Sequence, residues 1–180
     1  CLSKLLERVV HSRLQMYLSC NKLFNTHQSA YTKHRSTETA LVSLHNSIIN
    51  AMSMQKITGL CMLDLSSAFD TIDHSILVNR LSSWFGINGR ALLWLRSFLT
   101  ERSYSVKVLD NISAPIKLCY GVPQGSVLGP VLFALYTTPL STIISSCSLE
   151  HHLYADDTQM FTSFTASNFQ TSIAEIEFAF

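Results

Sequence analysis

The sequence of 180 residues predicts an α+β fold, on three observations. Apolar residues make up 47% of the chain and charged residues 14%, which is typical of a folded domain with a substantial core. Several segments repeat apolar residues at helical spacing. A few short segments are apolar throughout or alternate with a period of two. A chain of this length buries about 70% of its unfolded surface, so one domain can form a core.

The N-terminal third is predicted to be helical on both sides of a loop. Residues 2–18 place apolar side chains at helical spacing, whereas residues 24–35 show no period and are expected to form a loop. Ser36 can cap a second helix, whose apolar stripe ends at Met52. Residues 57–65, ITGLCMLDL, then predict a short buried strand.

The middle of the chain predicts two helices followed by a hairpin. A helix over 74–85 ends at Gly86, which suits a C-terminal cap, and Asn88 can begin the next helix. From residue 103 the period changes to two, which predicts a hairpin as far as about Cys119. Asp110-Asn111 offers its turn.

The C-terminal third predicts a turn, a helix, a second hairpin and the start of a further helix. Residues 121–126, GVPQGS, form the turn, and residues 127–140 the helix. Pro130 is tolerated there because it lies near the first helical turn. Residues 149–162 form the hairpin.

Charge, cysteines and hydropathy exclude several classes of protein. The net charge of +1 gives no sign of a nucleic-acid partner by itself. No segment has the roughly 18 uninterrupted apolar residues of a membrane span, and no signal peptide is evident. The first residue is not Met, so we expect a segment of a longer chain. Neither a disulfide framework nor a zinc site is indicated by the five scattered cysteines, Cys1, Cys20, Cys61, Cys119 and Cys147.

Two acidic positions stand out. Asp64 follows the apolar strand, and Asp156 and Asp157 lie at the tip of the second hairpin. Three carboxylates at one point repel each other unless a cation lies among them, and oxygen ligands favour Mg²⁺ or Mn²⁺. Two such ions about 4 Å apart can activate an attacking hydroxyl and stabilise a leaving phosphate oxygen. The simpler interpretation, a polar turn, stays open, because Asp is common in turns.

Four motifs occur in order along the chain. They are QSAYTKHRSTETAL (28–41), LDLSSAFDTIDHSIL (63–77), GVPQGSVLGPVLFALYTTPL (121–140) and YADDTQMF (154–161). Together they resemble the motifs of one family, the reverse transcriptases of LINE-type (non-LTR) retrotransposons. The resemblance covers most of the chain, from about residue 1 to 165. A lone pair of aspartates would be weak evidence, whereas the motifs together are specific.

The resemblance implies the palm of a right-hand polymerase, a small antiparallel sheet with helices packed on one face, plus part of the fingers. Residues 1–56 would lie on the fingers side and residues 57–180 would form the palm core. The thumb, any endonuclease region and the next palm motif, which often carries a lysine near pyrophosphate, would be absent. We therefore expect this segment alone to be inactive.

The activity implied by the resemblance is RNA-directed DNA synthesis. A primer 3′-hydroxyl would attack a deoxynucleoside triphosphate on an RNA template with two Mg²⁺ ions, or Mn²⁺. The partners would be RNA, DNA primer and deoxynucleotides, with no membrane, in the cytoplasm and nucleus. Two other classes stay open. One is a catalytically dead or repurposed fragment that binds RNA or protein, and the other is a metal-dependent phosphodiesterase.

The resemblance also assigns the metal ligands residue by residue. Asp64 and Asp156 would hold the two ions, the Leu65 carbonyl would add a ligand, and Asp157 would contribute less directly.

The nucleotide contacts implied by the resemblance lie in two motifs. The Ala68 N–H would face the triphosphate, Phe69 would lie beneath the sugar and exclude a 2′-hydroxyl, and Gln124 would touch the nucleotide and template base. Phe69 could instead be an ordinary core aromatic, and Gln124 could simply satisfy its turn.

Lys33 and Arg35 are candidate triphosphate contacts, although a solvated charge cluster is an alternative. Many family members have a basic residue where this chain has Thr32, so the phosphate-contacting residue is not fixed by the motif.

Four further polar residues have structural interpretations. Asp70 and Asp73 are expected to begin the following helix, where acidic residues are favoured. His151 and His152 are expected on the strand surface and not as ligands.

Overall fold

The computed structural model describes residues 2–178, and the chain divides into two compact units. We call the first the helical unit; it holds the chain up to Leu23 and Ser67–Tyr136. We call the second the sheet unit; it holds Phe24–Ser66 and the chain from Thr137 onward. These units are defined by compactness, so the expected functional division near residue 56 stays a prediction.

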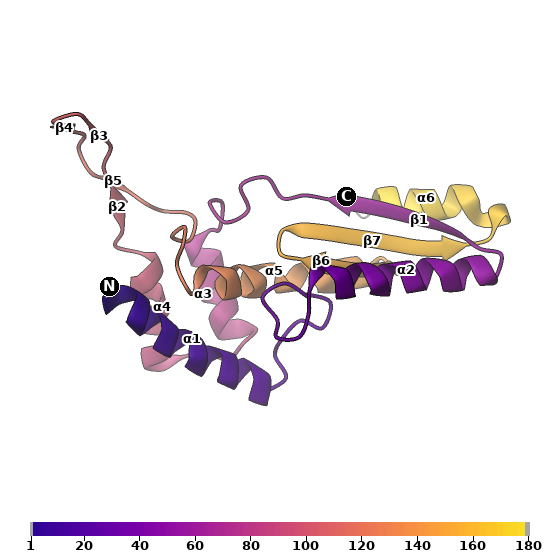
Figure 1. Ribbon diagram of the computed structural model, residues 1–180, viewed down its shortest axis with the longest axis horizontal. Helices are drawn as coiled ribbons and strands as arrows, with labels where there is room; N and C mark the ends of the chain where they lie inside the picture. Colours follow the sequence, from indigo (N-terminus) through magenta and orange to yellow (C-terminus); the bar gives the residue numbers. More distant parts are fainter. Residues whose placement is uncertain (1, 179–180) are drawn as a thin grey trace. The chain divides into compact units, whose positions relative to one another are not determined.

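The sheet unit contains one antiparallel sheet with the strand order β1-β7-β6 (Figure 1). β1 (Ile57–Leu63) pairs with β7 (Asp157–Phe164), and β7 pairs with β6 (Glu150–Tyr154). The second predicted hairpin is therefore confirmed. The prediction that β1 is buried is wrong, because β1 lies at the edge of the sheet; Leu60 is 41% exposed and Met62 69%.

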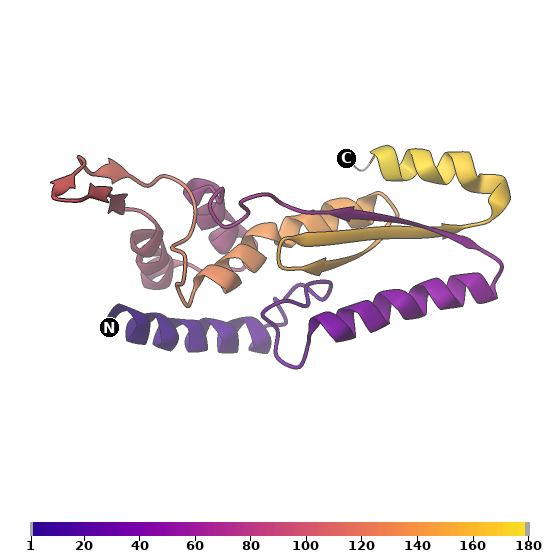
Figure 2. The same cartoon turned by 45° about the horizontal axis from the view of Figure 1, so that its top comes forward.

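Helices cover both faces of this sheet. Cys61 and Met160 are cross-strand partners, so they share one face, and they pack there with Ile144 and Ile176. α2 (Thr37–Ser53) contacts β1 and β6, and Figure 2 shows α2 and α6 (Phe169–Phe178) on opposite sides of the sheet. The predicted α+β class, a small antiparallel sheet with packed helices, is confirmed. The helices cover both faces and not one, because the alternate residues, among them Phe161, also need cover. The helical elements of this unit are α2 (Thr37–Ser53), the C-terminal part of α5 (Gly129–Ser146), the 3₁₀ turn η1 (Ala166–Asn168) and α6 (Phe169–Phe178).

Local sequence determines where α2 begins, but it does not determine where α5 ends. Ser36 caps α2 as predicted, since its side chain accepts from the Thr39 N–H in a capping box. α5 extends further than predicted and continues through Pro139 to Ser146. A proline inside a helix costs about 3 kcal/mol. The helix continues because the turn after Pro139 packs Ile144 into the core beneath the sheet.

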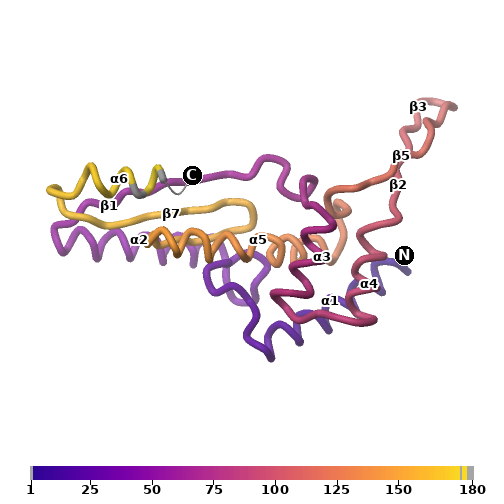
Figure 3. The backbone as a smooth tube through the Cα atoms, turned by 180° about the vertical axis from the view of Figure 1, so that it is seen from behind, coloured from indigo at the N-terminus to yellow at the C-terminus, as the bar shows by residue number. Residues whose placement is uncertain are grey.

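The helical unit consists of α-helices packed through leucine side chains. α3 (His74–Ser83) and α4 (Gly89–Leu99) contact each other and lie side by side (Figure 3). Asp73 caps α3, because its carboxylate accepts from the N–H groups of Ser75 and Ile76, and its pKa is lowered by the Ser75 hydroxyl and by these amides. Asp73 thus begins the helix as predicted. The helices are α1 (Leu2–Cys20), α3 (His74–Ser83), α4 (Gly89–Leu99) and the first part of α5.

The hairpin predicted after residue 103 is present in the helical unit as an interrupted ribbon. β2 (Ser103–Tyr104) pairs with β5 (Ile116–Lys117), and β3 (Lys107–Val108) pairs with β4 (Asn111–Ile112). Its turn is Leu109-Asp110, one residue earlier than predicted, because Leu109 takes the left-handed conformation with φ of 54°. Every residue of these four strands is exposed.

Among the described helices, none combines the length and the apolar character that crossing a membrane requires.

Candidate active site

The register of β1 and β7 brings the separated carboxylates to one end of the sheet. Leu63 lies opposite Thr158, Asp64 follows Leu63, and Asp157 directly precedes Thr158. Asp64 and the tip of the β6–β7 hairpin therefore lie at the same end of neighbouring strands, as the sequence predicts. All of these residues belong to the sheet unit.

The hairpin tip is a two-residue turn in a strained conformation. Tyr154 and Asp157 form the last cross-strand pair, so Ala155 and Asp156 make the turn. Ala155 has φ of 55°, a left-handed conformation that costs about 1–2 kcal/mol for a residue with a Cβ. Contacts elsewhere must hold the backbone there.

The carboxylate side chains at this end of the sheet supply the oxygen ligands that a hard divalent cation prefers. Asp64 and Asp157 are exposed and Asp156 is half-exposed, so their oxygen atoms are accessible to an ion. Oxygen ligands at a solvent-facing end of a sheet suit Mg²⁺. Within residues 2–178, no three Asp, Glu, His or Cys side chains yet form a cluster that could hold a metal ion.

Residues 27–29 of the predicted loop lie along the free edge of β6. The Ser29 N–H donates to the Leu153 carbonyl at 2.9 Å, and the Leu153 N–H donates to the His27 carbonyl at 2.9 Å. Gln28 and Leu153 form a parallel bridge. This segment, which has no strand pattern in its sequence, therefore extends the edge of the sheet up to the hairpin tip.

The basic residues predicted on this loop differ in their surroundings. Arg35 is exposed, but its guanidinium donates to the Thr26 carbonyl at 2.7 Å and the Gln28 carbonyl at 3.1 Å, so it braces its own loop. Arg35 also lines a polar pocket of about 530 Å³ in the sheet unit. Lys33 is exposed. A role of either residue in triphosphate binding stays a prediction.

Tyr31 is a neighbour of Asp156 that sequence reasoning missed. Burial raises the pKa of its hydroxyl, and the negative charge of Asp156 and the nearby Tyr154 raise this pKa further. Tyr31 also takes a left-handed conformation, with φ of 60°. A tyrosine in a polar loop has no sequence signal that would connect it to a carboxylate more than a hundred residues away.

The prediction that His151 lies on the strand surface is wrong. His151 is 5% exposed, its Nε2 lies 2.7 Å from the Ser141 Oγ, and its ring stacks on His27 with centroids 4.1 Å apart. It is buried because both α5 and the loop cover the edge strand β6. Burial, followed by the nearby His27, lowers its pKa to about 4. His152 is half-buried, and its Nε2 lies 2.8 Å from the Ser29 Oγ.

The predicted nucleotide contacts Ala68 and Phe69 lie in the helical unit. Ala68 is buried, and the half-buried Phe69 stacks on the buried Phe133 with ring centroids 4.8 Å apart. This contact fits the interpretation of Phe69 as a core aromatic, and a contact with a sugar stays a prediction. Leu65, the predicted carbonyl ligand, belongs to the sheet unit and is 40% exposed.

The turn that carries Gln124 packs against the segment after Phe69 within the helical unit. The Val122 N–H donates to the Phe69 carbonyl at 2.9 Å, and the Gln124 Nε2 donates to the Asp70 Oδ2 at 3.5 Å. Gly121 has φ of 80° and lies so close to the Asp70 backbone that a Cβ would clash. The two motifs therefore fit each other at a position that requires glycine.

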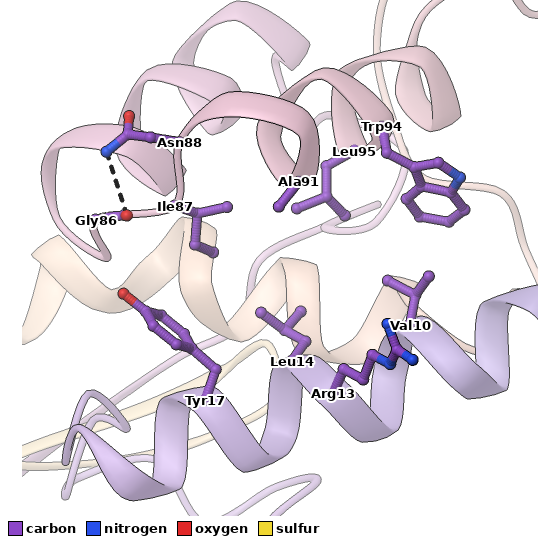
Figure 4. A pocket seen from close by; sticks show the side chains of 10 residues that line it. All are labelled: Val10, Arg13, Leu14, Tyr17, Gly86, Ile87, Asn88, Ala91, Trp94 and Leu95. Atoms are coloured by element: carbon purple, nitrogen blue, oxygen red, sulfur yellow. Dashed lines mark hydrogen bonds between the residues drawn. The ribbon is translucent and has the colours of Figure 1, made fainter.

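An apolar pocket of about 460 Å³ between α1 and α4 of the helical unit lies apart from these residues (Figure 4). In Figure 4, Leu14 and Tyr17 of α1 face Ile87 and Leu95 across it. No predicted site residue lines it. Its lining residues are Val10, Arg13, Leu14, Tyr17, Gly86, Ile87, Asn88, Ala91, Trp94 and Leu95.

Comparison with protein families gives one match along nearly the whole chain. The model described as "Reverse transcriptase (RNA-dependent DNA polymerase)" matches residues 1–179. The chain is 32% identical over 167 residues to the RNA-directed DNA polymerase from mobile element jockey of Drosophila melanogaster, covering 89% of this chain and 18% of that protein. It is 29% identical over 177 residues to the probable RNA-directed DNA polymerase from transposon BS of the same organism, covering 93% and 19%. The chain thus spans about a fifth of these relatives.

Solved structures show a similar fold at low sequence identity. The telomerase from Candida albicans, in complex with a fragment of telomeric RNA, matches 97% of this chain and 32% of its own, with a TM-score of 0.64 and 14% identity. The match to an apo telomerase from Candida tropicalis covers 94% of this chain and 36% of that chain, with a TM-score of 0.63 and 16% identity.

Proposed function

Because the chain belongs to the reverse transcriptase family, we propose that it supplies the catalytic carboxylates of an RNA-directed DNA polymerase. Its curated relatives are polymerases of Drosophila mobile elements, so the resemblance to LINE-type retrotransposons read from the sequence is confirmed. The protein that carries this segment would extend a primer on an RNA template with deoxynucleoside triphosphates.

The observation that carries this proposal is the strand register, which puts Asp64 and Asp157 at the same end of β1 and β7. A cation site shared by two distant segments requires carboxylates from both segments at one place, and this register provides them. Asp64, Asp156 and the Leu65 carbonyl would hold Mg²⁺, with Asp157 beside them. When bound, such ions would activate the primer hydroxyl and neutralise charge on the leaving phosphate oxygen.

The chain's own residues would orient the reactants. The Ala68 N–H would donate to the triphosphate, Phe69 would limit the space at the 2′ position, and Gln124 would contact the base pair. Nucleotidyl transfer needs no covalent intermediate with the protein. Positioning of the reactants and electrostatic stabilisation of the transition state would therefore supply the rate enhancement. This fits motifs built from carboxylates, an aromatic and glycine turns without a Ser or Cys nucleophile.

Primer extension by a complete polymerase that carries residues 1–180 tests this proposal. With an RNA template, a DNA primer, Mg²⁺ and deoxynucleotides, we expect extension that chelation of the metal abolishes. Asp64→Asn should remove nearly all of it, because one ligand loses its charge.

Two results would contradict the proposal. RNA binding without any extension would favour a repurposed binding module, and cleavage of nucleic acid without deoxynucleotides would favour a phosphodiesterase.

A further inference from the structure

The side chain of Gln28 is bound to the peptide groups of the carboxylate-bearing turn. Its Oε1 accepts from the Ala155 N–H at 3.0 Å, and its Nε2 donates to the Ala155 carbonyl at 3.3 Å. The same Oε1 accepts from the Ala30 N–H at 2.9 Å. Gln28 is only 4% exposed, so these bonds are shielded from water.

The side chain continues a pairing that the backbone begins. Residues 27–29 pair with Leu153 through main-chain bonds, and at the next step toward the tip the Gln28 amide takes the place of a peptide group. An amide can both accept from the N–H of Ala155 and donate to its carbonyl. A carboxylate lacks the donor, and asparagine is one methylene shorter.

This contact acts on the residue that precedes Asp156. Ala155 holds a left-handed conformation that a residue with a Cβ disfavours, and both of its peptide groups are bound by Gln28. The orientation of the Ala155–Asp156 peptide sets the direction in which the Asp156 side chain leaves the backbone. When Gln28 holds the Ala155 peptide groups in one orientation, it therefore also restricts the direction of the Asp156 side chain.

We propose that Gln28 is a positioning residue, which holds the β6–β7 turn so that the Asp156 carboxylate points toward Asp64 and a shared divalent cation. This rests on the function proposed above. Gln28 does not touch the reacting atoms; it acts through the backbone of Ala155. Residues that orient metal ligands typically change metal affinity or activity about 10–100-fold when they are lost.

The test replaces Gln28 with Met, which keeps the volume and removes all three bonds, in a complete polymerase that carries this segment. We expect the primer-extension rate to fall by about tenfold and the half-saturating Mg²⁺ concentration to rise by a similar factor, with primer–template affinity unchanged. Adding Ala155→Gly to Gln28→Met should recover part of the loss, because glycine adopts the left-handed conformation without strain. The recovery should appear in the half-saturating Mg²⁺ concentration, which a merely structural role would not move.

Asn25→Ala is the matched control in the same loop. Asn25 donates to the Ser141 Oγ at 2.8 Å and accepts from the His27 N–H at 3.0 Å, but it does not contact the turn. This variant should keep the wild-type Mg²⁺ dependence. If Gln28→Met fails to fold, Gln28→Asn keeps the amide without adding charge but is one methylene too short to reach Ala155, and it should show the same shift.

Two measurements that need no polymerase activity separate this proposal from the proposed function. In Gln28→Met, hydrogen exchange of the Ala155 amide should accelerate, and Mn²⁺ binding followed by electron paramagnetic resonance should weaken by about tenfold. If the wild type extends no primer, the proposed function fails while Mn²⁺ binding still decides the role of Gln28. Wild-type Mn²⁺ affinity in Gln28→Met, or equal losses in Asn25→Ala, would overturn the positioning role.

Discussion

Two hairpin turns in this chain have the same local design in different surroundings. In the β3–β4 turn, Leu109 has φ of 54° and Asp110 follows it. In the β6–β7 turn, Ala155 has φ of 55° and Asp156 follows it. Each turn joins the last cross-strand pair of its ribbon. A left-handed residue followed by Asp therefore marks a turn, and it does not by itself mark a site.

Long-range contacts distinguish the two turns. Leu109 is 87% exposed at the end of a fully exposed ribbon. The β6–β7 hairpin is anchored by the buried Leu153 and Met160, and its turn is bound by Gln28. The candidate site therefore depends on the contacts that the rest of the sheet unit makes with the turn.

The same substitution in both turns should have very different effects on activity. Asp156→Asn should reduce primer extension by a complete polymerase at least about a hundredfold, because a carboxylate that would hold the catalytic cations loses its charge. Asp110→Asn should leave extension within about twofold of the wild type. Similar losses in the two variants would mean that the turns do not differ in function.

A smaller effect is expected in the segment that follows Asp64. If Phe69 lies beneath the incoming sugar, Phe69→Val should raise ribonucleotide use relative to deoxynucleotide use by roughly tenfold. Phe98→Val, which truncates another half-buried ring of the helical unit, should leave sugar discrimination unchanged. Unchanged discrimination and lower stability in Phe69→Val would show that the ring only packs on Phe133.

The buried hairpin should also respond to acid. The lowered pKa of His151 means that the unfolded state binds a proton before the folded state does, so stability is lost as pH falls from about 6.5 toward about 4. We expect a loss on the order of 1 kcal/mol, because solvent screening reduces the full effect. Urea unfolding at pH 7 and pH 5 should show less pH dependence for His151→Gln. His45→Gln, on the exposed side of α2, should behave as the wild type does.

The smallest effect concerns the exposed turn. Leu109→Gly should raise the free energy of local opening of the β3–β4 ribbon by roughly 0.5–1 kcal/mol. Glycine removes the left-handed strain, and the exposed leucine side chain has few packing contacts to lose. Hydrogen exchange of the ribbon amides measures this. Faster exchange in Leu109→Gly would indicate that the leucine side chain stabilises the ribbon.

The sequence predicts those features that depend on local pattern. The acidic strand end at Asp64, the hairpin around Asp156 and the cap at Ser36 all follow from short-range periodicity and turn chemistry. The motif resemblance added the family, since three carboxylates alone are also compatible with a polar turn.

The features that sequence reasoning missed depend on contacts between distant segments. Residues 24–35 lack a strand pattern, so the pairing of Gln28 with Leu153 and Ala155 has no local signal. The burial of His151 likewise depends on cover from α5 and the loop. α5 continues past Pro139 because tertiary packing outweighs the local cost of proline.

Mn²⁺ binding by a complete protein without nucleic acid most directly tests whether Asp64 and Asp156 share one cation site. Electron paramagnetic resonance would follow the titration in the wild type and in Asp64→Asn, Asp156→Asn and Asp110→Asn. The shared site predicts that Asp64→Asn and Asp156→Asn each weaken binding by at least about tenfold, while Asp110→Asn retains wild-type affinity. Wild-type affinity in Asp64→Asn, with or without a loss in Asp156→Asn, would contradict the shared site.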